Sequence, residues 1–424
     1  MFELDVPYAR EHLRVRLPEQ DVAGVLLGHQ NEYKRDGTQE ELIESALDAP
    51  FASPTLEELA QGKRDIVVIS SDHTRPVPSK VTMPILLRRI HEAAPDARVR
   101  ILVATGMHRS STHEELLHKY GEEIVAEEEI VMHVATDDDA MVRIGTLPSG
   151  GDCEINAIAA QADLLIAEGF IEPHFFAGFS GSRKSVLPGV ASYKTIAYNH
   201  NGGFVHDGRA RAGVLHGNPV HRDMMAAARM ANLAFILNVV LDGDHEVIGA
   251  FAGDIQAAHQ AGCSFVRHLA GVSAVDCNVA ITTNGGYPLD QNIYQAVKGM
   301  TAAEATLPDG GVIIAIAACE DGHGGEGFFR NIAEGDPAAF EAGCIERPAD
   351  QTLPDQWTAQ IFARILAHHP VILVSDRCDH DMIRAMHMTP ANTVDEAIAL
   401  ARTLVDGDAR FAIIPDGLGV VVAR

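Results

Sequence analysis

Cysteine is scarce in this chain of 424 residues, and no pair of cysteines has the C-x-x-C spacing. Structural zinc sites and disulfide frameworks both depend on closely or regularly spaced cysteines. The scattered pattern therefore argues against both, and we expect a reducing, cytoplasmic environment. The six cysteines are Cys153, Cys263, Cys277, Cys319, Cys344 and Cys378.

Long apolar runs are also missing. No stretch approaches the roughly 20 consecutive apolar residues that cross a bilayer. The first 20 residues alternate charged and apolar side chains, whereas a secretory signal peptide has an uninterrupted apolar core. We therefore expect a soluble protein without membrane contacts.

Positive charge is in short supply. The chain has 33 Lys and Arg against 59 Asp and Glu, which gives a formal net charge of −26. Such a surface repels nucleic acid and anionic membranes, so neither is an expected partner. An anionic substrate would need a local cluster of Arg, Lys and His to overcome this field.

The length and the apolar pattern predict two α/β domains. A chain of this length exceeds one ordinary core, and 46% hydrophobic with 22% charged residues is an ordinary globular composition. Strands that alternate with helices imply largely parallel sheets flanked by helices. We place the boundary near residue 270, with a cofactor-binding domain at 1–270 and a second domain at 271–424. The expected buried strands are 65–72, 98–106, 128–135, 163–169 and 234–242, then 278–286, 311–319, 370–378 and 411–417.

Local patterns predict further elements. Alternation in residues 1–20 predicts a small hairpin, and the apolar spacing of Ser79 to Ala93 predicts a helix. Thr112 followed by Glu115 forms a capping box that starts another helix. A helical stretch at 254–269 is expected between the domains.

The most unusual stretch runs from Glu168 to Gly203. After a buried strand it collects His174, a Gly-Ser loop, an Arg-Lys pair that ends in Lys184, and His200. Glycines allow close backbone approach, and consecutive loop N–H groups form a nest for phosphate. A lysine beside such a nest pairs with phosphate or acts as a covalent handle. Flanking histidines supply acid, base or metal-ligand chemistry.

This stretch has two simpler interpretations. GFSGSRKS, Gly178 to Ser185, nearly matches the pattern G-x-x-x-x-G-K-[ST], but Arg183 replaces the second glycine. A side chain there obstructs the tight turn, which disfavours an NTPase. A purely structural Gly-rich turn is the simpler alternative, yet it does not explain His174 and His200.

Other polar loops follow strands in the same way, and ligands in α/β sheets bind beyond the carboxyl ends of strands. One carries Arg75, which can hold a substrate carboxylate through a bidentate pair and can be oriented by Asp72; the alternative is a structural pair of Asp72 and Arg75 that caps the next helix. The loop at 104–112 carries His108. A helix expected from Leu289 puts Gln295 and Lys298 on one face. Together these loops predict a polar enzyme site for a small anion in a cleft between the domains, with a zinc or iron hydrolase as an open alternative.

Five motifs resemble the nickel-dependent lactate racemase family. They are DHTRPVPS from Asp72, GMHR from Gly106, EPHFFAGFSGSRKSVLPG from Glu172, YNHNGG from Tyr198 and NGGYPLDQNIYQAVKG from Asn284. The resemblance covers essentially the whole chain and the order of its loops. It implies an isomerase, a racemase or epimerase of 2-hydroxy acids, that uses a nickel-pincer nucleotide. This cofactor is a pyridinium mononucleotide whose thio-substituents and one ring carbon grip nickel.

The resemblance also implies residue roles. Lys184 would carry the cofactor through a thioamide, and His200 would complete the nickel coordination. His108 and His174 would be the acid/base pair that handles the hydroxyl proton, while hydride from C2 moves to the pyridinium ring and back. The substrate would be held by Asp72, Arg75, Tyr294, Gln295, Lys298 and Trp357. The nucleotide phosphate would be held by Gly178, Ser180, Gly181, Ser182 and Arg183.

The resemblance is compatible with more than one 2-hydroxy acid substrate. Lactate or another short 2-hydroxy acid is the first choice, with malate and gluconate as alternatives. Met107, Phe175, Phe176 and Tyr287 are the candidates for setting pocket size. Cofactor-maturation enzymes are the expected transient partners. A non-catalytic nickel- or nucleotide-binding protein is the other class considered, and it would need Lys184 and His200 but not both acid/base histidines.

Overall fold

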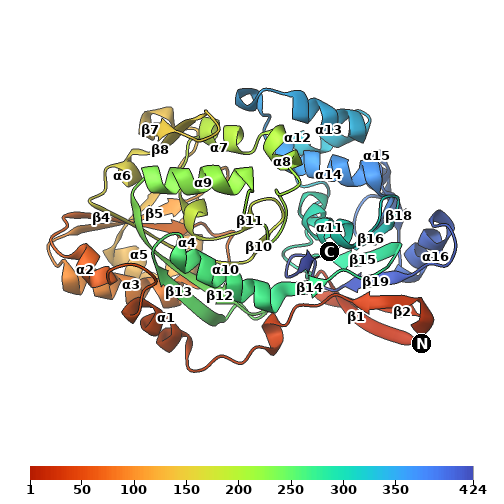
Figure 1. Cartoon of the computed structure of the whole chain (residues 1–424), viewed down its shortest axis with the longest axis horizontal. Coiled ribbons are helices and arrows are strands. Elements are labelled where there is room, and N and C mark those ends of the chain that lie inside the picture. The colour runs from red at the N-terminus through yellow and green to blue at the C-terminus, as the bar shows by residue number, and fades with distance from the viewer. Residues whose placement is uncertain (424) are drawn as a thin grey trace.

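Two six-stranded sheets form the framework of the computed structural model, which describes residues 1–423 (Figure 1). The first has the order β13-β12-β9-β4-β5-β6 and is parallel except for the pairing of β12 with β13. The predicted α/β class with largely parallel sheets is therefore confirmed. The strands of the first sheet are β4 (Asp65–Ser71), β5 (Arg98–Ala104), β6 (Glu129–Met132), β9 (Leu164–Phe170), β12 (Leu233–Leu241) and β13 (Val247–Gly253).

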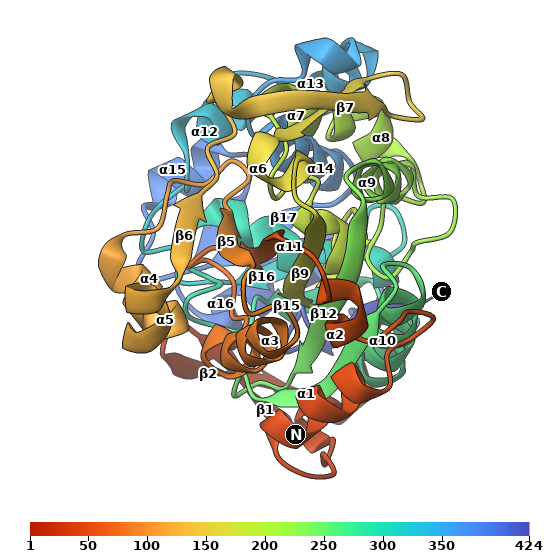
Figure 2. The same ribbon diagram turned by 90° about the vertical axis from the view of Figure 1, so that its left-hand side faces the viewer.

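The first sheet is covered on both faces because its central strands are apolar throughout. All seven residues of β9 are buried. In β4, Ile66 and Val68 pack toward α1 (Gln39–Asp48), α2 (Leu56–Ala60) and α3 (Ser79–Ala93). The alternating residues Val67 and Ile69 pack toward α9 (Pro219–Met230) on the other face. Figure 2 shows α1 and α3 on the near side of this sheet.

The second sheet is parallel throughout, with the order β18-β17-β16-β15-β19-β3. On one face lie α11 (Ile293–Thr306) and α14 (Gln356–His368), and on the other lies α16 (Val394–Leu404). The helices α12 (Glu326–Ala333), α13 (Pro337–Glu346) and α15 (His380–Ala385) complete this part. Its strands are β3 (Val22–Val25), β15 (Val279–Thr283), β16 (Val312–Ile316), β17 (Val371–Val374), β18 (Thr389–Ala391) and β19 (Phe411–Ile414).

The N-terminal segment belongs structurally with the second sheet. The predicted hairpin forms from β1 (Phe2–Tyr8) and β2 (Glu11–Leu17). Its apolar side packs on the strands of the second sheet, and β3 pairs in parallel with β19. The prediction of a first domain that begins at residue 1 did not include this pairing with the second sheet. The boundary near residue 270 stays a prediction. No helix in the part of the chain that the structure describes is long and apolar enough to cross a membrane.

Helix starts follow local capping chemistry. Thr112 and Glu115 form the predicted capping box of α4 (His113–Tyr120). The helix expected from Leu289 begins instead at Ile293, because the side chain of Asn292 accepts the backbone N–H of Gln295 and so caps α11 there. The helical stretch predicted at 254–269 forms α10 (Ala257–Ala270), which packs on β12 and β13 of the first sheet. It leads into β14 (Gly271–Ser273), which pairs with β20 (Val421–Ala423) near the C-terminus.

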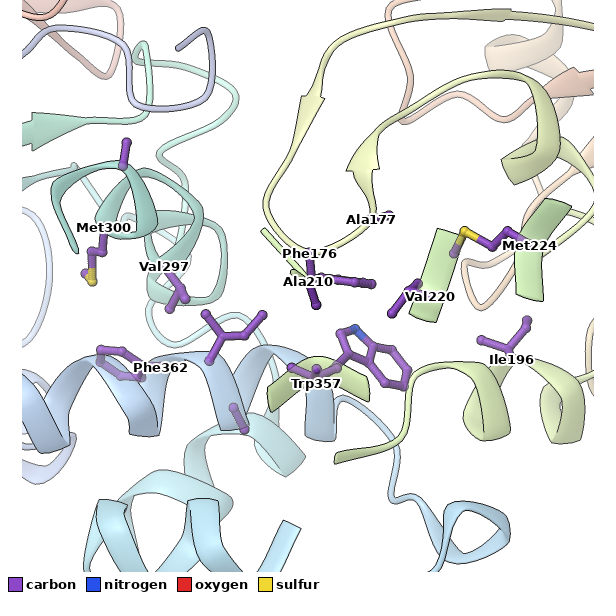
Figure 3. Packing of buried hydrophobic residues seen from close by; sticks show 14 of the residues in the cluster. Phe176, Ala177, Ile196, Ala210, Val220, Met224, Val297, Met300, Trp357 and Phe362 are labelled. Atoms are coloured by element: carbon purple, nitrogen blue, oxygen red, sulfur yellow. The ribbon is translucent and has the colours of Figure 1, made fainter. Parts of the chain in front are cut away.

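One apolar cluster joins the two parts beside the polar loops. Phe176 and Val220 come from the first part, and Val297 and Trp357 come from the helices α11 and α14 of the second (Figure 3). Because buried apolar contact is the dominant favourable term in association, this cluster keeps the strand-end loops of the two sheets together.

Candidate active site

The candidate site lies where the loops after the parallel strands of both sheets converge. The loop after β4 carries Asp72, the loop after β5 carries His108, and the segment after β9 carries His174 and Lys184. From the second sheet, α11 presents Lys298, whose ammonium lies 6.0 Å from the ring centre of Phe175. The carboxyl ends of parallel strands share one edge of a sheet, which explains why loops so distant in sequence meet here.

Asp72 and His108 form a hydrogen-bonded pair. The Nδ1–H of His108 donates to Oδ2 of Asp72 at 2.7 Å, and Thr74 donates to Oδ1 through both its N–H and its hydroxyl, at 3.1 and 2.6 Å. Burial raises the pKa of Asp72, but the His108 hydrogen bond and charge, with Thr74 and Arg75, outweigh it and lower the pKa below its usual value. With Nδ1 protonated, Nε2 of the neutral ring keeps a lone pair, and the His108 side chain is 43% exposed. His108 is thus arranged as an accessible base.

His174 and Lys184 are in direct contact. The backbone N–H of Ala177 donates to Nδ1 of His174 at 3.2 Å, so the proton of the neutral ring is on Nε2. That nitrogen lies 3.3 Å from Nζ of Lys184. Burial, with Arg183 and Arg75 nearby, puts the pKa of Lys184 well below 10.5, and burial with Lys184 also lowers the pKa of His174. A lowered pKa favours the neutral form of the amine, which can accept the Nε2–H and is a nucleophile.

His200 follows α7 (Tyr193–Asn199) and is buried. Its Nδ1–H donates to the carbonyl of Ile196 at 3.0 Å, which leaves Nε2 unprotonated in the neutral ring. The rings of Phe176 and Trp357 contact it, with centroids 5.2 and 5.1 Å away. Burial and the charge of Lys184 lower its pKa to about 3. A neutral imidazole with one orientation and one free nitrogen is suited to bind a metal.

The second domain contributes cationic and aromatic groups. Burial, together with Arg75, lowers the pKa of Lys298 to about 8, although Glu172 opposes this effect. Burial raises the pKa of Tyr294 to about 12, and its ring packs on Phe328 with centroids 5.2 Å apart. Gln295 is half-buried on the same helix. The structure therefore brings Lys298 and Tyr294 to the site and places Trp357 against His200.

Arg75 is exposed and forms no ion pair within 4 Å with any described residue. Its guanidinium donates to the hydroxyl of Thr74 at 3.3 Å, and its charge acts on Glu172, His174 and Lys184. It is therefore a cation at the site that is available to a carboxylate ligand.

The Gly-Ser loop is held from within by Arg183, which is completely buried. Its guanidinium donates to the carbonyls of Ala177, Phe179, Ser180 and Gly181 at 2.9, 2.7, 2.8 and 3.1 Å. A fixed fork of donors matches such converging carbonyls, and a lysine could not bond all of them. Arg183 thus has a structural role that the sequence did not reveal.

The remaining polar groups of this loop also bond within the protein. The N–H of Ser180 donates to the carbonyl of Glu172 at 2.9 Å, and the N–H of Ser182 donates to Asn238 at 3.0 Å. Gly178 and Gly181 have φ of +82° and +79°, and an added Cβ would lie 2.3 Å from the carbonyl oxygen of Val214 or 2.4 Å from Oδ1 of Asn238. The glycines are thus required by close packing of the protein itself. Binding of phosphate by this loop stays a prediction.

Two acidic residues at the site were missed by the sequence interpretation. Glu172 lies among Arg75, Lys298 and Lys184, yet burial outweighs these cations and raises its pKa. Asp416 lies nearby, and burial raises its pKa although the N–H groups of residues 418 and 419 donate to it. Glu172 stands two residues before His174, and Asp416 follows a strand. Both residues follow strands, where ligand-binding residues are expected. In a chain this rich in acidic residues, however, the residue type alone is not a signal.

The residues fit the cofactor that the resemblance implies. Lys184 offers a neutral amine for a covalent bond, and His200 offers one free nitrogen for nickel. The ring of Phe176 borders both, 5.9 Å from Nζ of Lys184 and 5.2 Å from the His200 ring. Within residues 1–423 no group of three His, Cys, Asp or Glu side chains is placed to hold a metal ion. Among these residues His200 offers a single imidazole, which is the one protein ligand that the resemblance implies for nickel.

Comparisons with known proteins agree with this geometry. Residues 8–213 match the family model of the lactate racemase N-terminal domain, and residues 272–422 match that of the C-terminal domain. The chain is 60% identical over 423 residues to the lactate racemase of Lactiplantibacillus plantarum and 51% identical to that of Thermoanaerobacterium thermosaccharolyticum, covering 100% and 99% of these proteins.

Solved structures show the same fold. The lactate racemase apoprotein from T. thermosaccharolyticum superposes with a TM-score of 0.96 at 50% identity, with full coverage of both chains. A protein from Thermotoga maritima shares the fold at 19% identity, with a TM-score of 0.67 and coverage of 92% of this chain and 100% of that protein.

Together, fold, site and relatives define a racemase, which is an isomerase. The chain belongs to the lactate racemase family, as its sequence motifs predicted.

Proposed function

We propose that the protein interconverts L- and D-lactate with a nickel-pincer nucleotide held by Lys184 and His200. The contact of 3.3 Å between Nζ of Lys184 and Nε2 of His174 carries the proposal, because it combines a neutral nucleophilic amine with an acid/base group. Relatives described as lactate racemases at 60% and 51% identity over their full length support lactate as substrate. Delivery of the cofactor by maturation enzymes belongs to the same proposal.

Two histidines handle the hydroxyl proton of the substrate. When bound, the cofactor would supply nickel and a pyridinium ring for hydride chemistry at C2 of the substrate, held by Lys184 and His200. His108 uses its Nε2 lone pair to remove the hydroxyl proton of one enantiomer, while Asp72 holds the proton on Nδ1. His174 takes up a proton from solvent to become an imidazolium and gives it to the oxygen when the 2-oxo acid is reduced on its other face, so it returns to the neutral ring while His108 releases its proton to solvent. The reverse direction exchanges these roles.

The charges around the site favour a short monocarboxylate. Arg75 and Lys298 come from different domains and both act electrostatically on His174, so they suit one carboxylate between them. Glu172 and Asp416 lie beside these cations, and burial raises the pKa of both carboxyl groups. In their ionised form they would repel a second carboxylate, as in malate. Phe175 and Phe176 give the small apolar surroundings that suit the methyl group of lactate.

A non-catalytic nickel or nucleotide carrier is disfavoured by the orientation of the two acid/base histidines. Such a protein has no use for the Asp72–His108 pair or for the Nε2–H of His174. A zinc or iron hydrolase would hold its metal with about three protein ligands. Residues 1–423 contain no such group of His, Cys, Asp or Glu side chains.

A substrate panel tests the proposal. Protein purified from a host that carries the maturation enzymes is incubated with single enantiomers of lactate, malate and gluconate, and the products are separated by chiral chromatography. We expect lactate to racemise fastest and Lys184→Ala to show no turnover. Faster conversion of malate or gluconate would assign a larger substrate. Protein with an intact adduct and no turnover of any 2-hydroxy acid would assign the carrier function.

A further inference from the structure

Glu168 is a buried carboxylate that the mechanism above does not use. It lies in β9 at the centre of the first sheet, and its residue is 1% exposed. No cation of residues 1–423 lies within 4 Å of it. Its partners are hydroxyl groups instead. Oε1 accepts from Ser70 at 2.5 Å and from Ser79 at 2.6 Å, and Oε2 accepts from Thr82.

These partners lie at the two ends of one loop. Ser70 is the second-to-last residue of strand β4, two residues before Asp72, and Ser79 is the first residue of α3. One carboxylate oxygen of Glu168 therefore bonds both ends of the segment 71–78, which carries Asp72 and Arg75. We name this segment the Asp72 loop.

The direction of these hydrogen bonds is defined. The phenol of Tyr120 donates to Ser70 at 2.8 Å, so the single hydroxyl proton of Ser70 is left for Glu168. Next to it, the ammonium of Lys119 donates to the hydroxyl of Ser71 at 3.3 Å. Donors thus point into Glu168 from the strand side and from the helix side of the Asp72 loop.

A packing role alone does not explain a carboxylate here. The preceding strand residues 164–167 are apolar, and an apolar side chain would fill the position without desolvating a charge. Hydrogen bonds from hydroxyls to a carboxylate are short and strong, and a fully satisfied buried network fixes geometry. The geometry that this network fixes is that of the Asp72 loop.

We propose that Glu168 is a positioning residue for the acid/base pair. By bonding both ends of the Asp72 loop, it holds the Asp72 carboxylate 2.7 Å from Nδ1 of His108 and so keeps the His108 proton on that nitrogen. Loss of these bonds lets the loop shift, and a misplacement of about 1 Å costs roughly 10²-fold in rate. The inference rests on the proposed acid/base role of His108, but the orientation of that ring is measurable without turnover.

The first test uses the apoprotein labelled with ¹⁵N-histidine. The variant Glu168→Gln keeps the size of the side chain but removes its charge and one acceptor oxygen. NMR assigns the tautomer of His108, identified by the signal that His108→Gln lacks. We expect a single Nδ1–H tautomer in the unmodified protein and a mixture of both tautomers in Glu168→Gln.

A matched control is available in Asp223→Asn. Asp223 is also completely buried and accepts a serine hydroxyl, from Ser149, but it lies on α9 away from the Asp72 loop. We expect this control to lower the melting temperature as Glu168→Gln does and to leave the His108 tautomer unchanged. In cofactor-loaded protein, Glu168→Gln is expected to lower kcat about 10-fold or more, and Asp223→Asn to lower it less than 2-fold.

A second variant covers the case in which Glu168→Gln does not fold. Ser79→Ala removes the hydrogen bond to Glu168 at the α3 end of the Asp72 loop and leaves those from Ser70 and Thr82. The same change in the His108 tautomer is therefore expected, to a smaller extent. A single Nδ1–H tautomer of His108 in both variants, or equal effects of Glu168→Gln and Asp223→Asn on kcat, would overturn the proposal. If the tautomer shifts but no 2-hydroxy acid is racemised, the positioning role stands and the proposed function fails.

Discussion

Nε2 of His174 lies 3.3 Å from Nζ of Lys184, while the backbone N–H of Ala177 holds the opposite ring nitrogen as an acceptor. The two contacts together define the protonation of both groups. The ring carries its proton on Nε2 and the amine accepts it, which agrees with the strongly lowered pKa of Lys184. One backbone hydrogen bond thereby orients a candidate acid/base group and leaves a nucleophilic amine beside it.

Attachment of the cofactor to Lys184 is the first prediction. A neutral amine forms an amide-type bond readily, whereas a protonated surface lysine does not. Intact mass of protein from a host with the maturation enzymes is expected to show an adduct that Lys184→Ala lacks. Lys194→Ala serves as control, because Lys194 is exposed and its pairing with Asp138 raises its pKa. An adduct that persists in Lys184→Ala would contradict the assignment.

The second prediction concerns the hydrogen at C2 of the substrate. A hydrogen that moves as hydride to the cofactor never resides on an imidazole nitrogen, so it does not exchange with water. Lactate deuterated at C2 is expected to racemise more slowly than ordinary lactate and to keep its label through many turnovers in H₂O, as followed by mass spectrometry. Steady uptake of solvent hydrogen at C2 would show instead that histidine bases remove a C2 proton.

The acid/base histidines provide the third prediction. His108→Ala and His174→Ala are each expected to reduce kcat by about 10² to 10⁴-fold, the usual contribution of a general acid/base. His118→Ala, at an exposed position of α4, is the matched control and is expected to keep the rate. Full activity in either of the first two variants would remove that histidine from the mechanism.

The Gly-Ser loop gives a prediction on stability. In Gly181→Ala the new Cβ would meet Oδ1 of Asn238 at 2.4 Å, and the residue would have to keep a φ of +79°. Strain and overlap of this kind lower the free energy of unfolding by about 1–3 kcal/mol each. Gly208→Ala, with no atom within 4 Å of the added Cβ, is expected to stay within about 0.5 kcal/mol of the parent. Urea unfolding of the apoproteins measures both, and equal stability of the two variants would contradict the packing argument.

Buried histidines predict a loss of stability in mild acid. Burial lowers the pKa of His133 to about 4 and, with the charge of Arg183, that of His221 to about 3, from 6.5 in the unfolded chain. Between these values the unfolded state binds more protons than the folded state, so the free energy of unfolding falls as pH decreases from about 6.5 toward 4. Each such histidine contributes a slope of up to about 1.4 kcal/mol per pH unit.

Unfolding by urea at pH 7 and pH 5 measures this effect in the apoprotein. His133→Gln removes one of the titrating groups and is expected to reduce the difference between the two pH values, even though it lowers stability at both. If His133→Gln leaves the difference in unfolding free energy between pH 7 and pH 5 unchanged, the pKa of His133 is the same in the folded and the unfolded chain.

Much of this protein is determined by local sequence. The capping box at Thr112 starts α4 wherever the helix packs, because both of its hydrogen bonds lie within four residues. The apolar runs of β4 and β9 specify buried parallel strands by themselves. His174 and Lys184 are ten residues apart in one motif, so their meeting at the site could be predicted from the sequence.

Tertiary structure decided what depends on distant partners. The pairing of β3 with β19 joins residues nearly 400 positions apart, and no local pattern specifies such a partner. Arg183 resembled a phosphate ligand in the sequence, but four converging carbonyls bind its guanidinium inside the fold. Glu168 has no local partner in the sequence, and only folding places the hydroxyls of Ser70 and Ser79 around its carboxylate. Hydrogen-bond partners and burial set the role of a polar side chain, and both are created only when distant segments pack together.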